Sequence, residues 1–291
     1  MASALSKVRR FVSWFIPYGV VLLRKKLGST NKLALPPYEL LASNKALQGK
    51  HEGRRCVILA NGPSAKNLEL IHLKGEIVLS VSNGYLHPNF AEFAPKYHCV
   101  PQITYGRMSV DDVVRWFSEM HEQLGDAELF LNETEADLVR DHNLFPGRKL
   151  HFLAMRENFD DMTADDRIDL ATIVPRVQSV PVMAIMIAMY MGFSEIVLLG
   201  ADHDHFKDGK YVYAFDLGVQ KDKDFSVAQD GQVTTAWYDD FHSLARLWRQ
   251  YRVLGDMAKT QDVKIVNATP GGELDEFPRV PYGSLFPRSS Q

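Results

Sequence analysis

Short apolar runs alternate with helix-like stretches from residue 54 onward. The runs are continuous and rich in β-branched residues, which is typical of parallel strands buried on both faces. They cover residues 55–60, 76–82, 149–154, 195–201 and 263–268. The stretches with helical periodicity cover residues 109–123, 133–142, 180–192 and 238–260. This alternation predicts an α/β protein with a doubly wound, mostly parallel, Rossmann-like sheet.

The last two predicted helices differ in their apolar pattern. The stretch 180–192 is apolar on every side and rich in Met, so we expect it to pack against the sheet in the core. The stretch 238–260 carries an apolar stripe at helical spacing, which predicts the face that contacts the core. That stripe consists of Phe241, Leu244, Ala245, Trp248 and Arg252.

Residues 1–26 have a pattern of their own. Apolar side chains recur on one helical face at Val8, Phe11, Val12 and Phe15. Every charged residue of the segment is basic, namely Lys7, Arg9, Arg10, Arg24, Lys25 and Lys26. The apolar part is shorter than the roughly 20 residues that span a bilayer. We therefore expect an amphipathic helix that binds the anionic cytoplasmic leaflet of the inner membrane, with packing on the protein's own core as the alternative.

Composition limits the remaining choices. Residues 27–53 have the polar, proline-containing character of a linker, and residues 54–291 form the predicted catalytic domain. The formal net charge of −3 argues against a nucleic-acid partner. The 2 cysteines, Cys56 and Cys99, are too few for a disulfide framework or a zinc cluster, so we interpret them as core thiols of a cytoplasmic protein.

The turn Asn61-Gly62-Pro63-Ser64 follows the first predicted strand. Glycine lets a ligand approach the backbone closely, proline fixes the turn, and the Ser64 hydroxyl is suited to cap the helix that follows. Such a turn presents backbone N–H groups at the carboxyl end of a strand, so we predict a phosphate or nucleotide there. It lacks the Gly-Lys-Ser/Thr of a P-loop and the Gly-x-Gly-x-x-Gly of a dinucleotide site.

Other polar residues follow the remaining predicted strands or flank the helices. Asn83-Gly84 follows the second strand and is expected beside Asn61-Gly62, because the carboxyl ends of parallel strands share one edge of the sheet. The others are Arg176 and Ser179 before the Met-rich helix, Asp202 and Asn267 after strands, Tyr213 in an extended piece, and His242 near the start of the last helix.

In this order the motifs resemble those of the bacterial sialyltransferases of glycosyltransferase family 42, and of the related pterin-diphosphokinase-like proteins of polysaccharide gene clusters. The matching segments are Ala60 to Ser64, Asn83, Arg176 with Ser179, Gly200 to Asp202, Tyr213 to Asp216, and His242 with Ser243. They extend over most of the predicted catalytic domain. The resemblance implies a sialyltransferase-type variant of the GT-A fold with a lid at about 203–237.

The resemblance also implies a chemistry. Inverting transfer would use a CMP-activated acidic sugar (sialic acid, another nonulosonate or Kdo) without a metal or other cofactor, with His242 as general base and Tyr213 bonded to the departing phosphate. The nucleotide-binding residues would be Asn61, Gly62, Pro63, Ser64, Asn83, Arg176 and Ser179. We also predict substrate-binding roles for five further residues, of which His203, Asp204 and Asn267 are chosen for their polar character and position and not for a family match: Gln102, Asp202, His203, Asp204 and Asn267. The sequence departs from the family pattern at two places. Gln102 stands where the family has an Asn, and the segment 202–205 stands where the family has a second phosphate-binding Tyr.

The segment Asp202-His203-Asp204-His205 leaves three interpretations open. Its carboxylates suit Mg²⁺ or Mn²⁺ at Asp202 and Asp204, it could contact substrate without a metal, or it could be a solvated loop. Two other functions also remain: a metal- and ATP-dependent enzyme like the pterin diphosphokinases, and a non-catalytic nucleotide-binding partner of polysaccharide assembly. The basic N-terminal helix favours a glycan or lipid-linked acceptor at the membrane, because an enzyme acting on a soluble pterin needs no membrane.

Overall fold

The computed structural model describes residues 38–100, 108–210, 212–214 and 236–286. The predicted membrane helix (1–26), Gln102 and most of the predicted lid (215–235) lie outside these residues. Within the described ranges, eight parallel strands form the sheet: β1 (Arg55–Leu59), β2 (Ile77–Val81), β3 (Tyr97–Cys99), β4 (Glu128–Asn132), β5 (Leu150–Glu157), β6 (Ile173–Pro175), β7 (Glu195–Leu199) and β8 (Lys264–Asn267). The predicted doubly wound α/β fold is confirmed.

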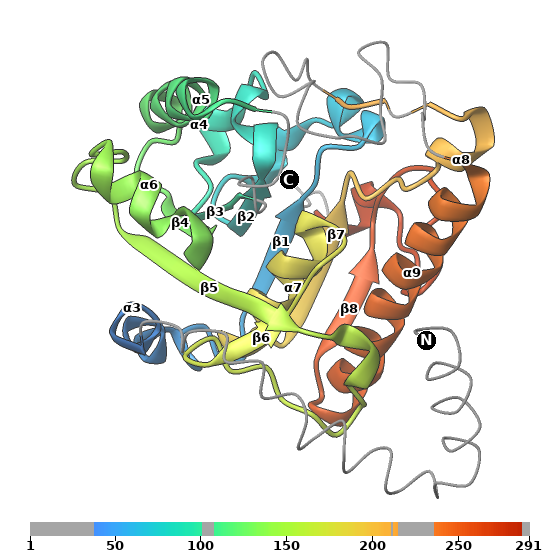
Figure 1. The fold of residues 1–291 in the computed structure, drawn as a ribbon. Coiled ribbons are helices and arrows are strands. Elements are labelled where there is room, and N and C mark those ends of the chain that lie inside the picture. The colour runs from blue at the N-terminus through green and yellow to red at the C-terminus, as the bar shows by residue number, and fades with distance from the viewer. Residues whose placement is uncertain (1–37, 101–107, 211, 215–235, 287–291) are drawn as a thin grey trace, which may run out of the picture. The chain divides into compact units, whose positions relative to one another are not determined.

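The strand order is β6-β5-β4-β3-β2-β1-β7-β8 (Figure 1). The chain therefore builds outward from β1 to β6 and then returns to place β7 on the other side of β1. Register pairs Ile58 with both Leu79 of β2 and Leu198 of β7. The direction of winding reverses between β1 and β7, and ligands of open α/β sheets bind beyond the carboxyl ends of the strands at this kind of switch point.

Helices cover both faces of the sheet. The α-helices are α3 (Tyr38–Ala42), α4 (Phe90–Phe93), α5 (Val110–Gln123), α6 (Ala136–Asp141), α7 (Val180–Tyr190), α8 (His205–Asp208) and α9 (Trp237–Thr260). The 3-10 turns are η1 (Ser43–Leu47), η2 (Pro63–Asn67), η3 (Leu70–Leu73), η4 (Ser82–Leu86), η5 (Glu133–Glu135), η6 (Phe159–Asp161) and η8 (Tyr282–Leu285). Figure 1 shows α7 over the middle of the sheet and α9 beside β8. None of the described helices combines the length and apolarity needed to cross a bilayer.

The alternation of side chains in β1 explains why its sequence is apolar throughout. Cys56 and Ile58 join the core that includes α7 and α9, whereas Val57 and Leu59 join the core that includes α5. Successive side chains of a strand point to opposite faces, so a strand covered on both faces needs apolar residues at every position.

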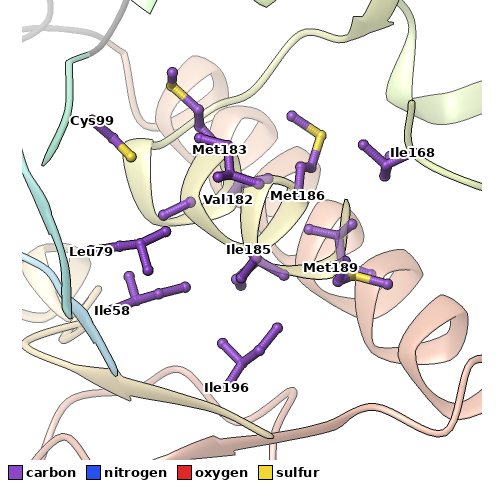
Figure 2. Packing of buried hydrophobic residues seen from close by; sticks show 14 of the residues in the cluster. Ile58, Leu79, Cys99, Ile168, Val182, Met183, Ile185, Met186, Met189 and Ile196 are labelled. Carbon is purple, nitrogen blue, oxygen red and sulfur yellow. The ribbon is translucent and has the colours of Figure 1, made fainter. Parts of the chain in front are cut away.

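Helix α7 lies inside the first of these cores. Every residue from Pro181 to Tyr190 is buried, as the all-round apolar pattern predicts. Figure 2 shows Val182 and Ile185 among strand residues that include Ile58 and Leu79. The start of α7 is therefore held rigidly against the strands that carry the predicted site.

The predicted core face of α9 is right at Trp248, which packs against the core, and wrong at three other positions. Phe241 is 53% exposed, and Ala245 and Arg252 are also exposed. The buried side of α9 instead contains Asp240, Leu247, Gln250, Tyr251, Val253, Leu254, Gly255, Met257 and Ala258. The difference arises because polar residues of this helix are buried with specific partners, described below, while aromatic residues of its first turns lie outside.

Part of the segment interpreted as a linker is folded. Leu41 of α3 and Leu47 of η1 are buried, and the Asn44 side chain donates hydrogen bonds to the carbonyl oxygens of Phe152 (2.7 Å) and Leu170 (2.8 Å). These bonds fasten the segment to β5 and to the loop before β6. The folded domain therefore includes residues from 38 onward and begins before the predicted boundary at 54.

Candidate functional site

The carboxylate of Asp202 closes the turn after β1. It accepts a hydrogen bond from the Ser64 hydroxyl (2.8 Å) and another from the Ser64 backbone N–H (3.3 Å). The Asp202 side chain is buried, which raises its pKa, and the two bonds from Ser64 oppose that rise. The prediction that Ser64 caps its own helix is wrong, because its hydroxyl donates to Asp202 and the segment that follows is the 3-10 turn η2.

This pairing changes the expected mode of anion binding. The donors of Ser64 already have an anionic partner, the carboxylate of Asp202. The prediction that they bind a phosphate directly is therefore not supported, and a phosphate would need other groups. Gly62 is required for a related reason: a Cβ there would lie 1.9 Å from Asp202 Oδ2 and 2.5 Å from the Gly200 carbonyl oxygen. The close approach of the turn after β7 is therefore sufficient to require glycine at this position.

The turns after β1 and β2 meet as the sequence predicts. Asn61 donates through Nδ2 to the carbonyl oxygen of Val81 (3.0 Å), and a Cβ on Gly84 would lie 3.4 Å from Asn61 Oδ1. Asn83 is buried in η4. Within the described ranges, the buried Oδ1 of Asn61 has no hydrogen-bond partner. An unpaired buried acceptor is costly, so an N–H or O–H of a ligand would stabilise the site at this point.

Tyr213 is brought to the same edge of the sheet. The backbone N–H of Ala214 donates to the carbonyl oxygen of Asn61 (2.9 Å), which fixes the short segment 212–214 beside the end of β1. Tyr213 itself is half-buried. Two of the predicted contacts, Asn61 and Tyr213, therefore lie within one structural unit although about 150 residues separate them in the sequence.

Arg176 and Ser179 lie on the loop that enters α7, and α9 holds this loop. Gln250 accepts a hydrogen bond from the Gln178 backbone N–H (2.8 Å) and donates to the Arg176 carbonyl oxygen (3.1 Å). The Gln178 side chain donates to the Ser243 hydroxyl (3.0 Å). The exposed side chain of Arg176 thus projects from a fixed backbone.

Two buried residues that the sequence analysis did not single out connect α9 to the segment after β7. Tyr251 Oη lies 2.8 Å from His203 Nε2 and 3.2 Å from Ser179 Oγ. Asp240 Oδ1 lies 3.4 Å from His205 Nε2, and both of these side chains are buried. Burial lowers the pKa of His203 to about 4 and lowers that of His205, where Asp240 opposes the shift. The signal that could have identified Tyr251 and Asp240 is a polar group on the buried stripe of an otherwise amphipathic helix.

His242 lies in the second turn of α9, and its side chain is exposed. Its ring stacks on that of Tyr238 with 6.2 Å between centroids. Its neighbours along the helix, Asp240 and Ser243, contact the segment after β7 and the loop before α7. The structure therefore brings this stretch of α9 to the site, whereas the imidazole of His242 faces outward.

Asn267 does not fit the interpretation as a substrate-binding residue. It is completely buried, its Oδ1 accepts from the Thr269 N–H (3.0 Å) and its Nδ2 donates to the Leu274 carbonyl oxygen (3.0 Å). Both ends of the amide shape the loop after β8. That loop in turn donates the Glu273 N–H to the carbonyl oxygen of Asp202 (2.7 Å).

The metal interpretation of segment 202–205 finds no ligand set in the described part of the chain. No group of three or more His, Cys, Asp or Glu side chains there is arranged to hold an ion. Asp202 is engaged by Ser64, His203 by Tyr251 and His205 by Asp240. Asp204 is half-buried and precedes α8.

No family model matches the chain, and no curated protein matches it in sequence. Among solved structures, the chain is similar to the sialyltransferase CstII from Campylobacter jejuni in complex with a substrate analogue, cytidine-5'-monophosphate: 16% identity, 79% of this chain and 85% of that chain covered, TM-score 0.46. It is also similar to a variant of the sialyltransferase CST-II in complex with CMP: 18% identity, 77% of this chain and 86% of that chain covered, TM-score 0.42.

Proposed function

We propose that this protein is an inverting glycosyltransferase that moves an acidic sugar from a CMP-activated sugar donor to a glycan or lipid-linked glycan. The observation that carries the proposal is the convergence of separate sequence motifs at the β1/β7 switch point, where the bond between Asp202 and Ser64 joins two of them. Ligands of open α/β sheets bind at this place. The order of the motifs along the chain supports the sugar nucleotide as the ligand.

In this proposal, the nucleotide lies across the ends of β1 and β2. The unpaired Oδ1 of Asn61 accepts a hydrogen bond from the ligand, and Asn83 lies on the adjoining turn. Asp202 has a structural role, because its carboxylate shapes the turn and repels a phosphate placed directly on it. Anionic groups of the sugar donor are bound instead by Arg176, Ser179 and Tyr213, which are respectively a cation and two hydroxyl donors.

The proposed transfer is a single displacement at the anomeric carbon. The acceptor hydroxyl loses its proton to the imidazole of His242 as its oxygen forms the new glycosidic bond. The bond from the anomeric carbon to the phosphate oxygen breaks, and CMP leaves with the electron pair. Tyr213 donates a hydrogen bond to this oxyanion, which stabilises the charge that develops. In the described structure His242 faces outward, so the proposal requires the acceptor to approach from the exposed side of α9.

We further propose that residues 1–26 bind the protein to the inner face of the cytoplasmic membrane. The support is the sequence pattern, in which basic residues surround one apolar helical face. A lipid-linked acceptor of surface-polysaccharide assembly would be presented at the same surface.

Thermal unfolding with added nucleotides tests the proposal. A ligand that binds only the folded state adds about 2.7 kcal/mol when its concentration is about 100 times its Kd. We expect CMP, CTP and CMP-sugars to raise the unfolding temperature, and UDP, GDP and their sugars to leave it unchanged. Protection by ATP with Mg²⁺ but by no cytidine nucleotide would favour the diphosphokinase-like alternative.

A further inference from the structure

Ser179 is connected to His203 through the hydroxyl of Tyr251. Tyr251 Oη lies 3.2 Å from Ser179 Oγ and 2.8 Å from His203 Nε2. The three residues come from the loop before α7, from α9 and from the segment after β7. Tyr251 is completely buried, whereas Ser179 is half-buried at the start of α7. The chain of hydrogen bonds thus runs from the interior to the edge of the proposed site.

The Ser179 hydroxyl is not used to cap its own helix. Ser179 occupies the N-cap position of α7, yet its side chain makes no capping bond. Its described partner is Tyr251, in the interior. The backbone before it is held by the neighbouring residue of α9, Gln250, through the two bonds to Gln178 and Arg176. Adjacent residues of α9 therefore fix both the loop and the hydroxyl.

His203 reaches Tyr251 from an unusual backbone conformation. Its φ is +50°, in the left-handed region that residues other than glycine seldom adopt. Its ring packs edge-on to Trp248 with 6.0 Å between centroids. Conformations of this kind persist where the surrounding structure holds them and are enriched at functional sites.

Counting protons decides what Ser179 can offer a ligand. The Tyr251 hydroxyl has one proton and can donate it to only one neighbour. With its pKa lowered to about 4 by burial, His203 is neutral at pH 7 and has one N–H. If this proton is on Nε2, His203 donates to Tyr251, Tyr251 donates to Ser179, and the Ser179 proton points away from the interior. In the opposite arrangement Ser179 donates to Tyr251 and has no proton left for an anion.

We infer that Tyr251 and His203 are positioning residues that keep the Ser179 hydroxyl as a hydrogen-bond donor to an oxyanion of the sugar donor. The oxyanion is either the carboxylate of the acidic sugar or the phosphate of CMP, both of which accept such a bond. The inference rests on the proposed function. It adds Tyr251 to the site and gives His203, which the sequence analysis predicted to contact substrate directly, a positioning role instead. Of the two proton arrangements described above, only the one in which His203 donates to Tyr251 and Tyr251 donates to Ser179 leaves the Ser179 proton available for a bond to an anion.

The experiment compares binding of three probes to the full-length protein by isothermal titration calorimetry. The first probe, cytidine, carries no anionic group. The second, CMP, carries the phosphate. The third, an unreactive analogue of CMP-sialic acid, carries both the phosphate and the sugar carboxylate. Tyr251→Phe should weaken binding of the anionic probes about 10-fold, equal to about 1.4 kcal/mol, and leave cytidine unchanged. A loss already present with CMP identifies the phosphate as the ligand of Ser179, and a loss only with the analogue identifies the carboxylate.

Two further variants separate positioning from a general structural effect. In a Ser179→Ala background, Tyr251→Phe should cause no additional loss, because it acts through the missing hydroxyl. Tyr97→Phe is the matched control: Tyr97 is also completely buried and its hydroxyl lies 2.7 Å from the Nε2 of a histidine, His51, but at the amino end of the sheet. It should leave all three affinities unchanged.

If Tyr251→Phe does not fold, His203→Asn serves the same purpose. Asn tolerates a left-handed backbone and is too short to reach Tyr251, so the anion-specific loss should be smaller and again absent in the Ser179→Ala background. Unchanged affinity in these variants, or a loss that adds to that of Ser179→Ala, would overturn the inference while leaving the proposed function standing. Failure of the wild-type protein to bind any cytidine ligand would overturn both.

Discussion

The Ser64 hydroxyl donates a 2.8 Å hydrogen bond to the carboxylate of Asp202, 138 residues later in the chain. The bond is a direct consequence of the strand order, because β7 returns to lie beside β1 and brings the two carboxyl ends together. The bond holds the turns after β1 and β7 together at the proposed site. It also means that the strongest candidate for phosphate binding in the sequence is occupied by one of the protein's own carboxylates.

Asp202→Ala should therefore destabilise the fold. It leaves the half-buried hydroxyl and N–H of Ser64 without their acceptor, which costs about 1–2 kcal/mol. Ser64→Ala removes one of these donors and should cost about 1 kcal/mol. Urea unfolding of the two single variants and the double variant measures the coupling between the two residues. Equal stability of wild type and Asp202→Ala would contradict the structural role assigned to the bond.

Gly62→Ala should be strongly destabilising although its φ is an ordinary −65°. The added methyl would overlap Asp202 Oδ2 and the Gly200 carbonyl oxygen, so the turns after β1 and β7 must separate. Gly283→Ala is the matched control, because a Cβ there meets nothing within 4 Å. It should be neutral or stabilising by up to about 1 kcal/mol. Similar unfolding midpoints for the two variants would show that the close approach at Gly62 is unimportant.

Some of the fold could be read from the sequence, and particular strands show why the rest could not. β1, β2, β5, β7 and β8 were predicted because each forms a continuous apolar run. β3 has only three residues, with His98 at its centre, and so leaves no apolar run to recognise. The order that places β7 beside β1 depends on crossovers between distant segments, which local periodicity does not contain.

The candidate site shows the same division. The polar turns at Asn61 and Asn83 were predicted to meet, because the carboxyl ends of parallel strands share one edge of the sheet, and they do. The buried partners on α9 were missed. Tyr251 and Asp240 lie on its inner face because each has a specific polar partner, while Phe241 lies outside. A hydrophobicity pattern assigns these positions the other way round.

Stability should fall as the pH drops below about 6.5. Burial lowers the pKa of His98 to about 3, and those of His51 and His203 to about 4. In the unfolded chain each histidine binds a proton near pH 6.5, so between pH 6.5 and about 4 the unfolded state holds more protons than the folded state. The free energy of unfolding must then decrease as protons are added.

Urea unfolding at pH 7, 5.5 and 4.5 measures this dependence. Each histidine contributes at most about 1.4 kcal/mol per pH unit. His98 bonds to the Ser80 hydroxyl through Nδ1 (2.7 Å), and a His98→Gln variant should show a shallower slope even if it is less stable at pH 7. A slope that is the same in the variant and the wild type would show that His98 is not one of the responsible groups.

Deletion of residues 1–26 should abolish membrane binding and leave the catalytic domain folded. These residues lie outside the described part of the chain, so the expectation rests on their basic, amphipathic pattern. Flotation with vesicles of neutral lipid and of about 30% anionic lipid should show binding of the full chain only to the anionic set, and weaker binding at high salt. Unfolding of the shortened protein would instead favour packing of this helix on the protein's own core.

His242→Ala should lower kcat by about 10²- to 10⁴-fold with little change in the affinity for the sugar donor, because it removes the proposed base but no proposed contact to the nucleotide. His142→Ala is the matched control, since His142 is another exposed histidine and caps the end of α6. Tyr213→Phe should cost less, because it removes one hydrogen bond to a leaving group that is already a stable anion.

The same assay distinguishes His242 from the histidine that the structure adds to the site. His205 is held by the Asp240 carboxylate, an arrangement that also suits a proton acceptor, but its side chain is buried. If His205 is instead structural, His205→Gln should lower the unfolding temperature and leave the kcat of the folded protein nearly unchanged. Addition of EDTA should leave the wild-type rate unchanged under the proposed mechanism. Full activity of His242→Ala would contradict its role as the base. Combined with loss of activity in a folded His205→Gln variant or in EDTA, it would favour segment 202–205 as the place of the chemistry, because His205 and the carboxylates suited to a metal lie there.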